Sequence, residues 1–233
     1  MTLKTDLESE VKEIFQAIWT DRDGQVVPEP EDLKLGNDAV KLDATVLYAD
    51  MSDSTDLVDN YSHEFAAEIY KAYLRCAAQI IKNEQGTITA YDGDRVMAVF
   101  LGNSKNTSAV RSALMINYAV REIINPLLKK QYPNKGYLLK HVIGVDTSEL
   151  FVARIGVRND NDLVWVGRAA NYAAKLCSRN GDYSTYITND VFSIMHSNVK
   201  YDGKTNSLIW HEETWTERNN IKIHGTNGWW TFK

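Results

Sequence analysis

The sequence is poor in cysteine, in basic charge and in long apolar runs, and each shortage excludes a class of protein. It contains two cysteines, Cys76 and Cys177, in 233 residues, so no disulfide framework is required and a reducing compartment is expected. The net charge of −5 argues against a nucleic-acid binder that relies on a basic surface. No apolar run approaches the ~20 residues of a membrane-spanning helix, and residues 1–15 lack the apolar core of a signal peptide. We therefore expect a cytoplasmic protein with neither a membrane nor a nucleic acid as partner.

The N-terminal segment differs in pattern from the rest of the chain. Leu7, Val11, Ile14 and Ile18 recur at steps of three or four, which predicts an amphipathic helix over residues 3–19. This helix would pack either on a partner subunit or on its own domain. A connector with glycine and proline follows. We expect a helix and linker over residues 1–38 and one main domain over residues 39–233.

Hydrophobic periodicity in the main domain alternates between strand and helix. An Asp-Gly pair at residues 92–93 marks a tight turn between two strands. The predicted strands are residues 44–49, 87–91, 95–100, 137–146, 150–157, 162–167, 207–211, 220–225 and 229–232. The predicted helices are residues 56–84, 105–131, 168–180 and 189–196. This order predicts an α+β sandwich with helices packed on one sheet.

Two aspartates lie just beyond the ends of predicted strands. Asp50 ends the apolar run at residues 44–49, and Asp94 stands in the turn of the next hairpin. Two carboxylates about 4 Å apart repel by roughly 4 kcal/mol at an effective dielectric constant of 20, so such a pair shares a proton or holds a divalent cation. Hard oxygen ligands favour Mg²⁺ or Mn²⁺, and two such ions on a triphosphate favour in-line attack on phosphorus. We favour metal binding over the alternative of ordinary turn acids.

The segment directly after Asp50 is rich in small polar residues. Its backbone N–H groups, with the hydroxyls of Ser52, Ser54 and Thr55, are expected to hold phosphate oxygens. Asp53 or Thr55 is also expected to cap the following helix. The two roles are compatible, because capping uses a side chain and phosphate binding uses the backbone.

Three stretches of the chain resemble the signatures of class III nucleotide cyclases. They are TVLYADMSDST, YDGDRVMAVF and GRAANYAAKL, in the order and at the spacing of that family. The resemblance covers roughly residues 42–232 and, within the family, is greatest to the pyrimidine cyclases of the bacterial antiphage system called Pycsar. It implies the ferredoxin-like palm sandwich of class III cyclases, with a mixed, mostly antiparallel sheet. The N-terminal helix would be an addition to that fold.

The resemblance implies roles for five positions. Asp50 and Asp94 match the two metal-binding aspartates, and the carbonyl of Met51 matches a backbone ligand, for two Mg²⁺ or Mn²⁺ ions per site. Asn171 matches the asparagine that orients the ribose. Lys175 stands where the family usually has an arginine that contacts the transition state. Lysine keeps the positive charge and loses the planar fork, so we expect Lys175 to serve as the cation.

Three further residues are candidates for phosphate binding. Arg168 is a neighbour of Asn171 in the sequence and is within reach of a triphosphate. The family places a lysine before the glycine of the last strand pair, where this chain has His224, with Lys222 two residues earlier on the same strand face. If His224 holds phosphate, binding weakens as the pH rises through roughly 6.5. The alternative is an exposed strand histidine.

The base pocket departs from that of purine-selective members. The two positions that read a purine are Ala90 and Val164 here, and neither side chain forms hydrogen bonds. The remaining polar candidates are Tyr48, which would narrow the pocket, and Arg95, which would donate to the carbonyls of a pyrimidine. Uracil offers two carbonyl acceptors, so UTP is favoured over CTP. The alternative is that Tyr48 packs within a strand and Arg95 points to solvent.

Together these residues predict a metal-dependent cyclase that forms the 3′,5′-cyclic monophosphate of uridine (cUMP) and pyrophosphate. The resemblance implies a homodimer with shared active sites, a downstream cyclic-nucleotide effector protein and a role in antiphage defence. Cytidylate or adenylate cyclase activity and an inactive nucleotide-binding module are the alternatives. A phosphatase with an aspartyl nucleophile is disfavoured, because it needs Asp-x-Asp and Ser52 occupies the third position.

Overall fold

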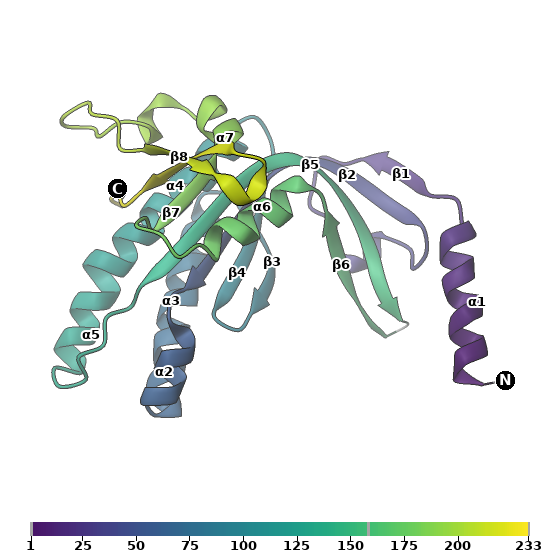
Figure 1. Ribbon diagram of the computed structural model, residues 1–233, viewed down its shortest axis with the longest axis horizontal. Coiled ribbons are helices and arrows are strands. Elements are labelled where there is room, and N and C mark those ends of the chain that lie inside the picture. The colour runs from purple at the N-terminus through teal and green to yellow at the C-terminus, as the bar shows by residue number, and fades with distance from the viewer. Residues whose placement is uncertain (1, 158, 233) are drawn as a thin grey trace.

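The computed structural model describes residues 2–157 and 159–232, and one mixed sheet organises them (Figure 1). Its strands are β1 (Thr20–Asp23), β2 (Asp38–Met51), β3 (Thr87–Asp92), β4 (Arg95–Phe100), β5 (His141–Val157), β6 (Asp160–Val166), β7 (Thr185–Thr188), β8 (His211–Trp215) and β9 (Ile221–Thr226). The main order is β3-β4-β2-β5-β7-β9-β8, with β1 paired to β2 and β6 to β5. Only β1–β2 and β5–β7 are parallel among the strand pairs of the described residues. The predicted mixed, mostly antiparallel α+β fold is confirmed.

Helices connect the strands and cover both faces of the sheet. They are α1 (Leu3–Gln16), α2 (Ser54–Asn60), α3 (His63–Asn83), α4 (Lys105–Tyr118), α5 (Asn125–Gln131), α6 (Arg168–Cys177) and α7 (Asn189–Ile194). A π-helical segment, η2 (Ala119–Ile124), joins α4 to α5, and short 3₁₀ turns are η1 (Pro30–Asp32), η3 (Ser197–Val199) and η4 (Thr216–Arg218). None of the described helices is both long and apolar enough to span a lipid bilayer.

The alternation of side chains along β2 explains why helices pack on both faces of the sheet. Leu47, Ala49 and Met51 join the core cluster that contains the buried residues of α3 and α4. Val46 and the alternate apolar residues before it join a second cluster with the small residues of α6, including Ala173. Side chains in a strand point alternately to opposite faces, so one strand supplies both cores. Helices therefore cover the end of the sheet that carries the first predicted aspartate on both sides.

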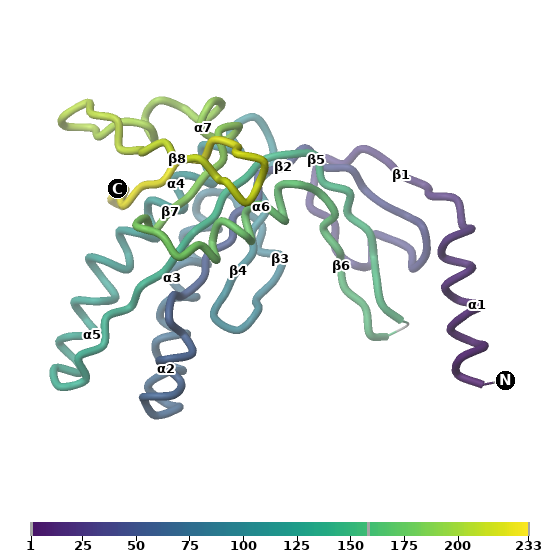
Figure 2. The backbone as a smooth tube through the Cα atoms, viewed as in Figure 1, coloured from purple at the N-terminus to yellow at the C-terminus, as the bar shows by residue number. Residues whose placement is uncertain are grey.

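The longest feature of the sheet is an antiparallel ribbon of β2 and β5, paired from Ala39↔Ala153 to Met51↔His141. Their traces run side by side (Figure 2). They extend from the body of the molecule, which carries β3, β4, β7–β9 and helices α2–α7, into an arm that also carries β1 and β6. Body and arm together give the outline of an inverted V in the view of Figure 1.

Residues 147–149 do not form the turn expected between two strands, and that prediction was wrong. Thr147 pairs with Thr45 inside the ladder. The Thr45 hydroxyl lies 3.1 Å from the Thr147 hydroxyl, which lies 3.1 Å from the carbonyl of Ala44. The polar side chains are satisfied within the sheet, so the strand continues through them.

The predicted helix over residues 56–84 is also wrong as a single element. It is divided into α2 and α3, and the chain is extended at Tyr61. The hydroxyl of Ser62 accepts a hydrogen bond from the N–H of Phe65 and caps α3. Apolar residues recur at helical spacing across this boundary, from Leu57 to Ile81, and this regular pattern hid the capping signal.

Smaller errors concern the edges of the sheet. Residues 20–23 of the expected connector form β1, and β7 was not predicted. The strand expected over residues 207–211 begins only at residue 211, as β8. Residues 229–232 form no strand; the N–H of Trp230 donates to the carbonyl of Leu114 instead. The predicted hairpin of β3 and β4 and the helical stretch over residues 105–131 are confirmed.

Candidate active site

Asp50 and Asp94 come from neighbouring strand ends of the body. Asp50 lies near the end of β2, and Asp94 lies in the turn between β3 and β4. The pair Ala49↔Val96 is the last of the β2–β4 ladder, so both aspartates stand just beyond it. Burial, followed by the negative charge of Asp94, raises the pKa of Asp50 to about 6. The fold thus brings two carboxylates from distant parts of the sequence into electrostatic contact.

The donors at this point fit a divalent cation. The Asp94 Oδ2 atom is buried and has no hydrogen-bond partner among the described residues, although a buried polar oxygen is normally satisfied. Asp50 and Asp94 supply hard carboxylate oxygens, and the Met51 carbonyl follows directly. No group of three or more His, Cys, Asp or Glu side chains forms a metal site in the described ranges. Asp50, Asp94 and the Met51 carbonyl are the donors that the sequence predicted, and their chemistry fits a hard divalent ion.

A buried polar network, missed in the sequence, supports the end of β2. Tyr73 of α3 is fully buried, with its hydroxyl 3.5 Å from the carbonyl of Asp50. His141, the pairing partner of Met51, has its Nε2 atom 2.7 Å from Asn117 Oδ1. Burial lowers the pKa of His141 to about 4, so it is neutral at neutral pH. Tyr73 lies within the helix predicted over residues 56–84, and nothing local in the sequence distinguishes its hydroxyl.

The two residues predicted to read the base lie together. The Arg95 guanidinium carbon lies 5.5 Å from the centre of the Tyr48 ring, and Arg95 donates to Asp92 Oδ2 at 2.7 Å. Burial raises the pKa of Tyr48. Cys177, at the end of α6, is close to this pair: burial and then the Asp50 charge raise its pKa to about 12, whereas Arg95 lowers it. Cys177 is a neighbour of the site that sequence reasoning missed.

Ala90 and Val164 are not brought together within one chain. Ala90 is exposed on β3, where it pairs with Met97. Val164 is half-buried on β6 of the arm, where it pairs with Ala153. The two positions therefore lie on opposite edges of the sheet.

The polar segment after Asp50 leads into α2. Asp53 stands at the N-cap position with a positive φ of 60°, but its side chain makes no capping hydrogen bond. Thr55 lies inside the helix. The expected side-chain cap is therefore absent. The N–H of Ser52 donates to the carbonyl of Lys140 at 3.0 Å, while the side chains of Asp53 and Thr55 are exposed and that of Ser54 is half-buried.

Asn171 and Lys175 lie on the exposed side of α6, one turn apart. The Nδ2 of Asn171 donates to the carbonyl of Gly167 at 3.2 Å. Within the described part of the chain, no hydrogen bond or salt bridge joins either residue to the two aspartates. One copy of the chain thus carries both halves of the predicted machinery without linking them by such a contact.

Arg168 begins α6 and belongs to a polar network. Its guanidinium contacts Asp146, which is fully buried, at 3.1 Å and Asp190 at 2.5 Å. Thr188 also donates to Asp146, at 2.5 Å. A predicted phosphate contact by Arg168 would therefore compete with two carboxylates that already hold it.

Lys222 and His224 share a strand but not an environment. Lys222 is exposed, pairs with Glu212 at 2.9 Å and lines a cavity of about 270 Å³ together with Arg168. His224 is buried, and its ring stacks on Phe192 with 3.8 Å between centroids. Burial lowers its pKa, so the alternative of an exposed strand histidine is wrong. Because burial disfavours the charged form of His224, the predicted loss of phosphate binding would shift to a pH below roughly 6.5.

Two known proteins are similar to this chain over almost its whole length. No protein-family model matches the chain. It is 49% identical over 232 residues to a uridylate cyclase of Xanthomonas perforans, covering 99% of both chains. It is 51% identical to a uridylate cyclase of Burkholderia cepacia, covering 93% of this chain and 94% of that one.

A solved structure gives the fold. A class III adenylyl cyclase-like ATP-binding protein from Pseudomonas aeruginosa superposes with a TM-score of 0.67 at 18% identity, over 83% of this chain and 43% of the neighbour. At that identity the likeness concerns the fold alone, and it confirms the class III cyclase architecture. Because the two uridylate cyclases cover nearly the whole chain at about half identity, this chain is a nucleotide cyclase and belongs to the uridylate cyclase family.

Proposed function

We propose that this nucleotide cyclase converts UTP into 3′,5′-cyclic UMP and pyrophosphate, using Mg²⁺ or Mn²⁺, with two ions per site. The observation that carries the proposal is the pair Asp50 and Asp94, with the raised pKa of Asp50 and the buried Oδ2 of Asp94, which has no hydrogen-bond partner among the described residues. A carboxylate pair in this state binds hard cations. The relatives are named uridylate cyclases, which supports UTP as the nucleotide.

The proposed reaction joins the ribose 3′ oxygen to the α-phosphorus. The 3′ hydroxyl gives its proton to solvent water, the new O–P bond forms, and the bond from the α-phosphorus to the β-bridging oxygen breaks to release pyrophosphate. Bound divalent ions supply Lewis acidity toward the attacking and leaving oxygens. Asn171 orients the ribose, and Lys175 places a positive charge beside the phosphorus where negative charge increases. Asp50, Asp94 and the Met51 carbonyl would hold the ions.

Selection of the base is assigned to Tyr48 and Arg95. Tyr48 fills space that a purine would need, and the Arg95 donors suit the two carbonyl oxygens of uracil. Cytosine has an amino donor in place of one carbonyl and suits an arginine less well. Their contact at 5.5 Å and the lack of a polar side chain at Ala90 and Val164 support this assignment.

The triphosphate is assigned to the segment Ser52–Thr55 and to the cationic side chains beside the 270 Å³ cavity. Arg168 and Lys222 line that cavity, whereas His224 does not. We therefore rank Arg168 and Lys222 above His224 as phosphate ligands. The Asp190 and Glu212 partners would have to exchange with phosphate oxygens for this to occur.

A homodimer with shared sites completes the proposal. Asp50 and Asp94 from one copy would act with Asn171 and Lys175 from the other, and an isologous dimer would carry two equivalent sites. The exposure of Asn171 and Lys175 supports this arrangement. We further propose that cUMP acts on a separate effector protein in antiphage defence, within the cytoplasm.

A second candidate is a nucleotide-binding module without turnover. It is favoured by one observation, the lysine at position 175 where the family usually has arginine. Lysine provides a point charge and not the two-pronged donor.

The deciding experiment incubates the purified protein with ATP, GTP, CTP or UTP and Mn²⁺, and identifies products by mass spectrometry. We expect cUMP from UTP and no product from the Asp94→Asn control. A dominant product from CTP or ATP would overturn the assignment of the base. Binding of all four nucleotides with no cyclic product would support the inactive module.

A further inference from the structure

Helix α1 presents an apolar face that none of the described residues of its own chain covers. No described residue of α1 is buried. Leu7, Val11 and Ile14 follow the 4, 3 spacing of an interface seam, with Phe15 and Ile18 beside them 83% and 91% exposed. A contiguous exposed apolar stripe of this kind marks a contact surface.

This face is held in a fixed place. The side-chain Nδ2 of Asn37 donates to the carbonyls of Ile14, at 3.1 Å, and Ala17, at 2.7 Å. Trp19 packs edge-on against Phe151 of β5, with 5.0 Å between ring centroids. The helix is therefore attached to the end of the arm.

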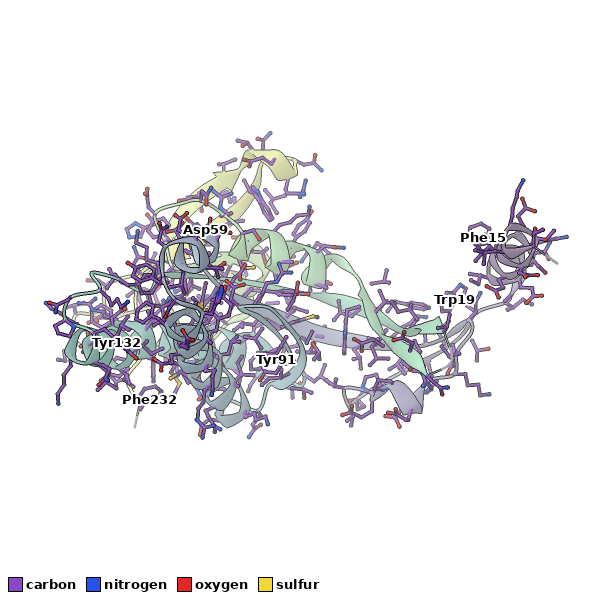
Figure 3. The ribbon with its side chains drawn as sticks, turned by 90° about the horizontal axis from the view of Figure 1, so that it is seen from below. Phe15, Trp19, Asp59, Tyr91, Tyr132 and Phe232 are labelled. Atoms are coloured by element: carbon purple, nitrogen blue, oxygen red, sulfur yellow. The ribbon has the colours of Figure 1, made fainter. Side chains whose placement is uncertain are left out.

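The attachment keeps α1 away from its own body. Phe15 and Trp19 lie at one extremity of the molecule, while Tyr132 and Phe232 lie in the body at the other (Figure 3). Figure 1 shows the same separation from a perpendicular direction. Because two views agree, α1 cannot bury its stripe within a single chain without bending the arm.

A complementary surface exists at the opposite end of the same molecule. Around α5, Leu127 and Leu138 are 60% and 59% exposed, and Lys129 and Lys130 form the last basic turn. Helix α1 carries four acidic residues against two lysines. An acidic apolar helix and a basic apolar surface on opposite ends of one chain can meet only between two copies.

We propose that α1 is an interface helix that packs on a second copy of this chain, with the α5 end as its receiving surface. The arrangement extends the homodimer of the proposed function and rests on that part of it. In a closed twofold dimer each copy gives one α1 and receives one. A standard interface buries about 800 Å² per partner, and α1 would supply the part of it that the arm carries.

The test compares two variants that each add two aspartates to α1. Val11→Asp/Ile14→Asp places them in the seam, and Ser9→Asp/Gln16→Asp places them on the opposite face as a control. Sedimentation velocity over a concentration series measures the monomer–dimer Kd, and thermal melts verify folding. We expect the seam variant to raise the Kd at least about tenfold relative to wild type, with the control unchanged. Equal Kd values for the two variants, or a wild-type chain that stays monomeric, would overturn the proposal.

A charge exchange tests the receiving surface. Glu8→Lys/Glu10→Lys on α1 and Lys129→Glu/Lys130→Glu on α5 should each weaken the dimer, and combining them in one chain should restore it. A seam variant that dissociates while the combined variant stays weak would overturn the α5 assignment. None of these measurements uses nucleotide. A chain that dimerises through α1 but forms no cUMP would contradict the proposed function alone.

Discussion

Asp50 illustrates a conflict between stability and chemistry in one side chain. Its folded pKa of about 6 lies above the ordinary 3.8 because of burial and the charge of Asp94. The stability linked to this group is therefore present below pH 3.8 and lost as the pH rises through 6. At neutral pH Asp50 is therefore charged at a cost in stability that Arg95 and the N–H of Met51 offset only in part.

Replacing Asp50 by asparagine should therefore stabilise the metal-free protein while removing cyclase activity. At pH 8 in EDTA we expect the free energy of unfolding to rise by about 1 kcal/mol, after allowance for partial solvent exposure. The melting temperature should rise by about 2–4 °C. Mn²⁺ should raise the melting temperature of the wild type but not of the variant. The exposed Asp59→Asn serves as the control, and a less stable Asp50→Asn protein would contradict this account.

His141 should make the protein sensitive to mild acid. Burial lowers its pKa from 6.5 to about 4. The stability that it contributes is thus complete above pH 6.5 and is lost as the pH falls through 4, by up to about 3 kcal/mol. Urea unfolding between pH 7 and pH 4 should give a smaller decrease for His141→Gln than for the wild type. The exposed His63→Gln should keep the wild-type slope; an equal slope in both variants would assign the acid sensitivity elsewhere.

Helix α6 depends on a close approach to β5. A Cβ added at Gly144 would lie 2.1 Å from the carbonyl oxygen of Ala173 and 2.6 Å from the N atom of Cys177, both backbone atoms of α6. Backbone cannot move aside as a flexible side chain does. Gly144 therefore allows α6, which carries Asn171 and Lys175, to pack closely on β5.

Gly144→Ala should displace α6 and lower both stability and turnover. We expect a loss of about 2–3 kcal/mol in the free energy of unfolding, as for overpacked cores, measured by urea titration. Turnover should fall because Asn171 and Lys175 move with the helix. Gly203→Ala, which would meet nothing within 4 Å, should be neutral. Wild-type stability of Gly144→Ala would refute the close packing.

The elements that sequence could predict are those with local signals. The Asp-Gly turn marks the β3–β4 hairpin and the place of Asp94, and the end of the apolar run in β2 marks Asp50. The division of α2 from α3 at Ser62 and the passage of β5 through Thr147 depend on hydrogen bonds to residues elsewhere in the fold. Local pattern carries no information about such partners.

The candidate site shows the same limit. Asp50, Asp94, Tyr48 and Arg95 could be proposed from the sequence because they lie next to strand ends and turns. The burial of His224 arises from α7, which packs over β9 and brings Phe192 onto its ring. A strand histidine gives no sign of this cover in the sequence.

For the assembled molecule, the division of labour between copies can be tested by mixing subunits. An Asp50→Ala chain lacks a proposed metal ligand, and a Lys175→Ala chain lacks the proposed cation. If sites are shared, a mixed dimer has one intact site, so an equimolar mixture of two inactive proteins should recover about a quarter of wild-type activity, because half of randomly formed dimers are mixed. The cyclic product formed after mixing is the measurement. No recovery, with mixed dimers verified by mass spectrometry, would contradict shared sites.

The long pairing of β2 with β5 also restricts how this chain can change over generations. One residue inserted into β2 between the arm and Asp50 would turn every later side chain to the other face. Each residue of β2 from the insertion to Asp50 would then face the side of the sheet opposite to the one that it faces now. Lengthening the arm is therefore tolerable only in steps of two residues, accompanied by a matching step in β5. Lineages with longer or shorter arms should differ by even numbers of residues in these strands.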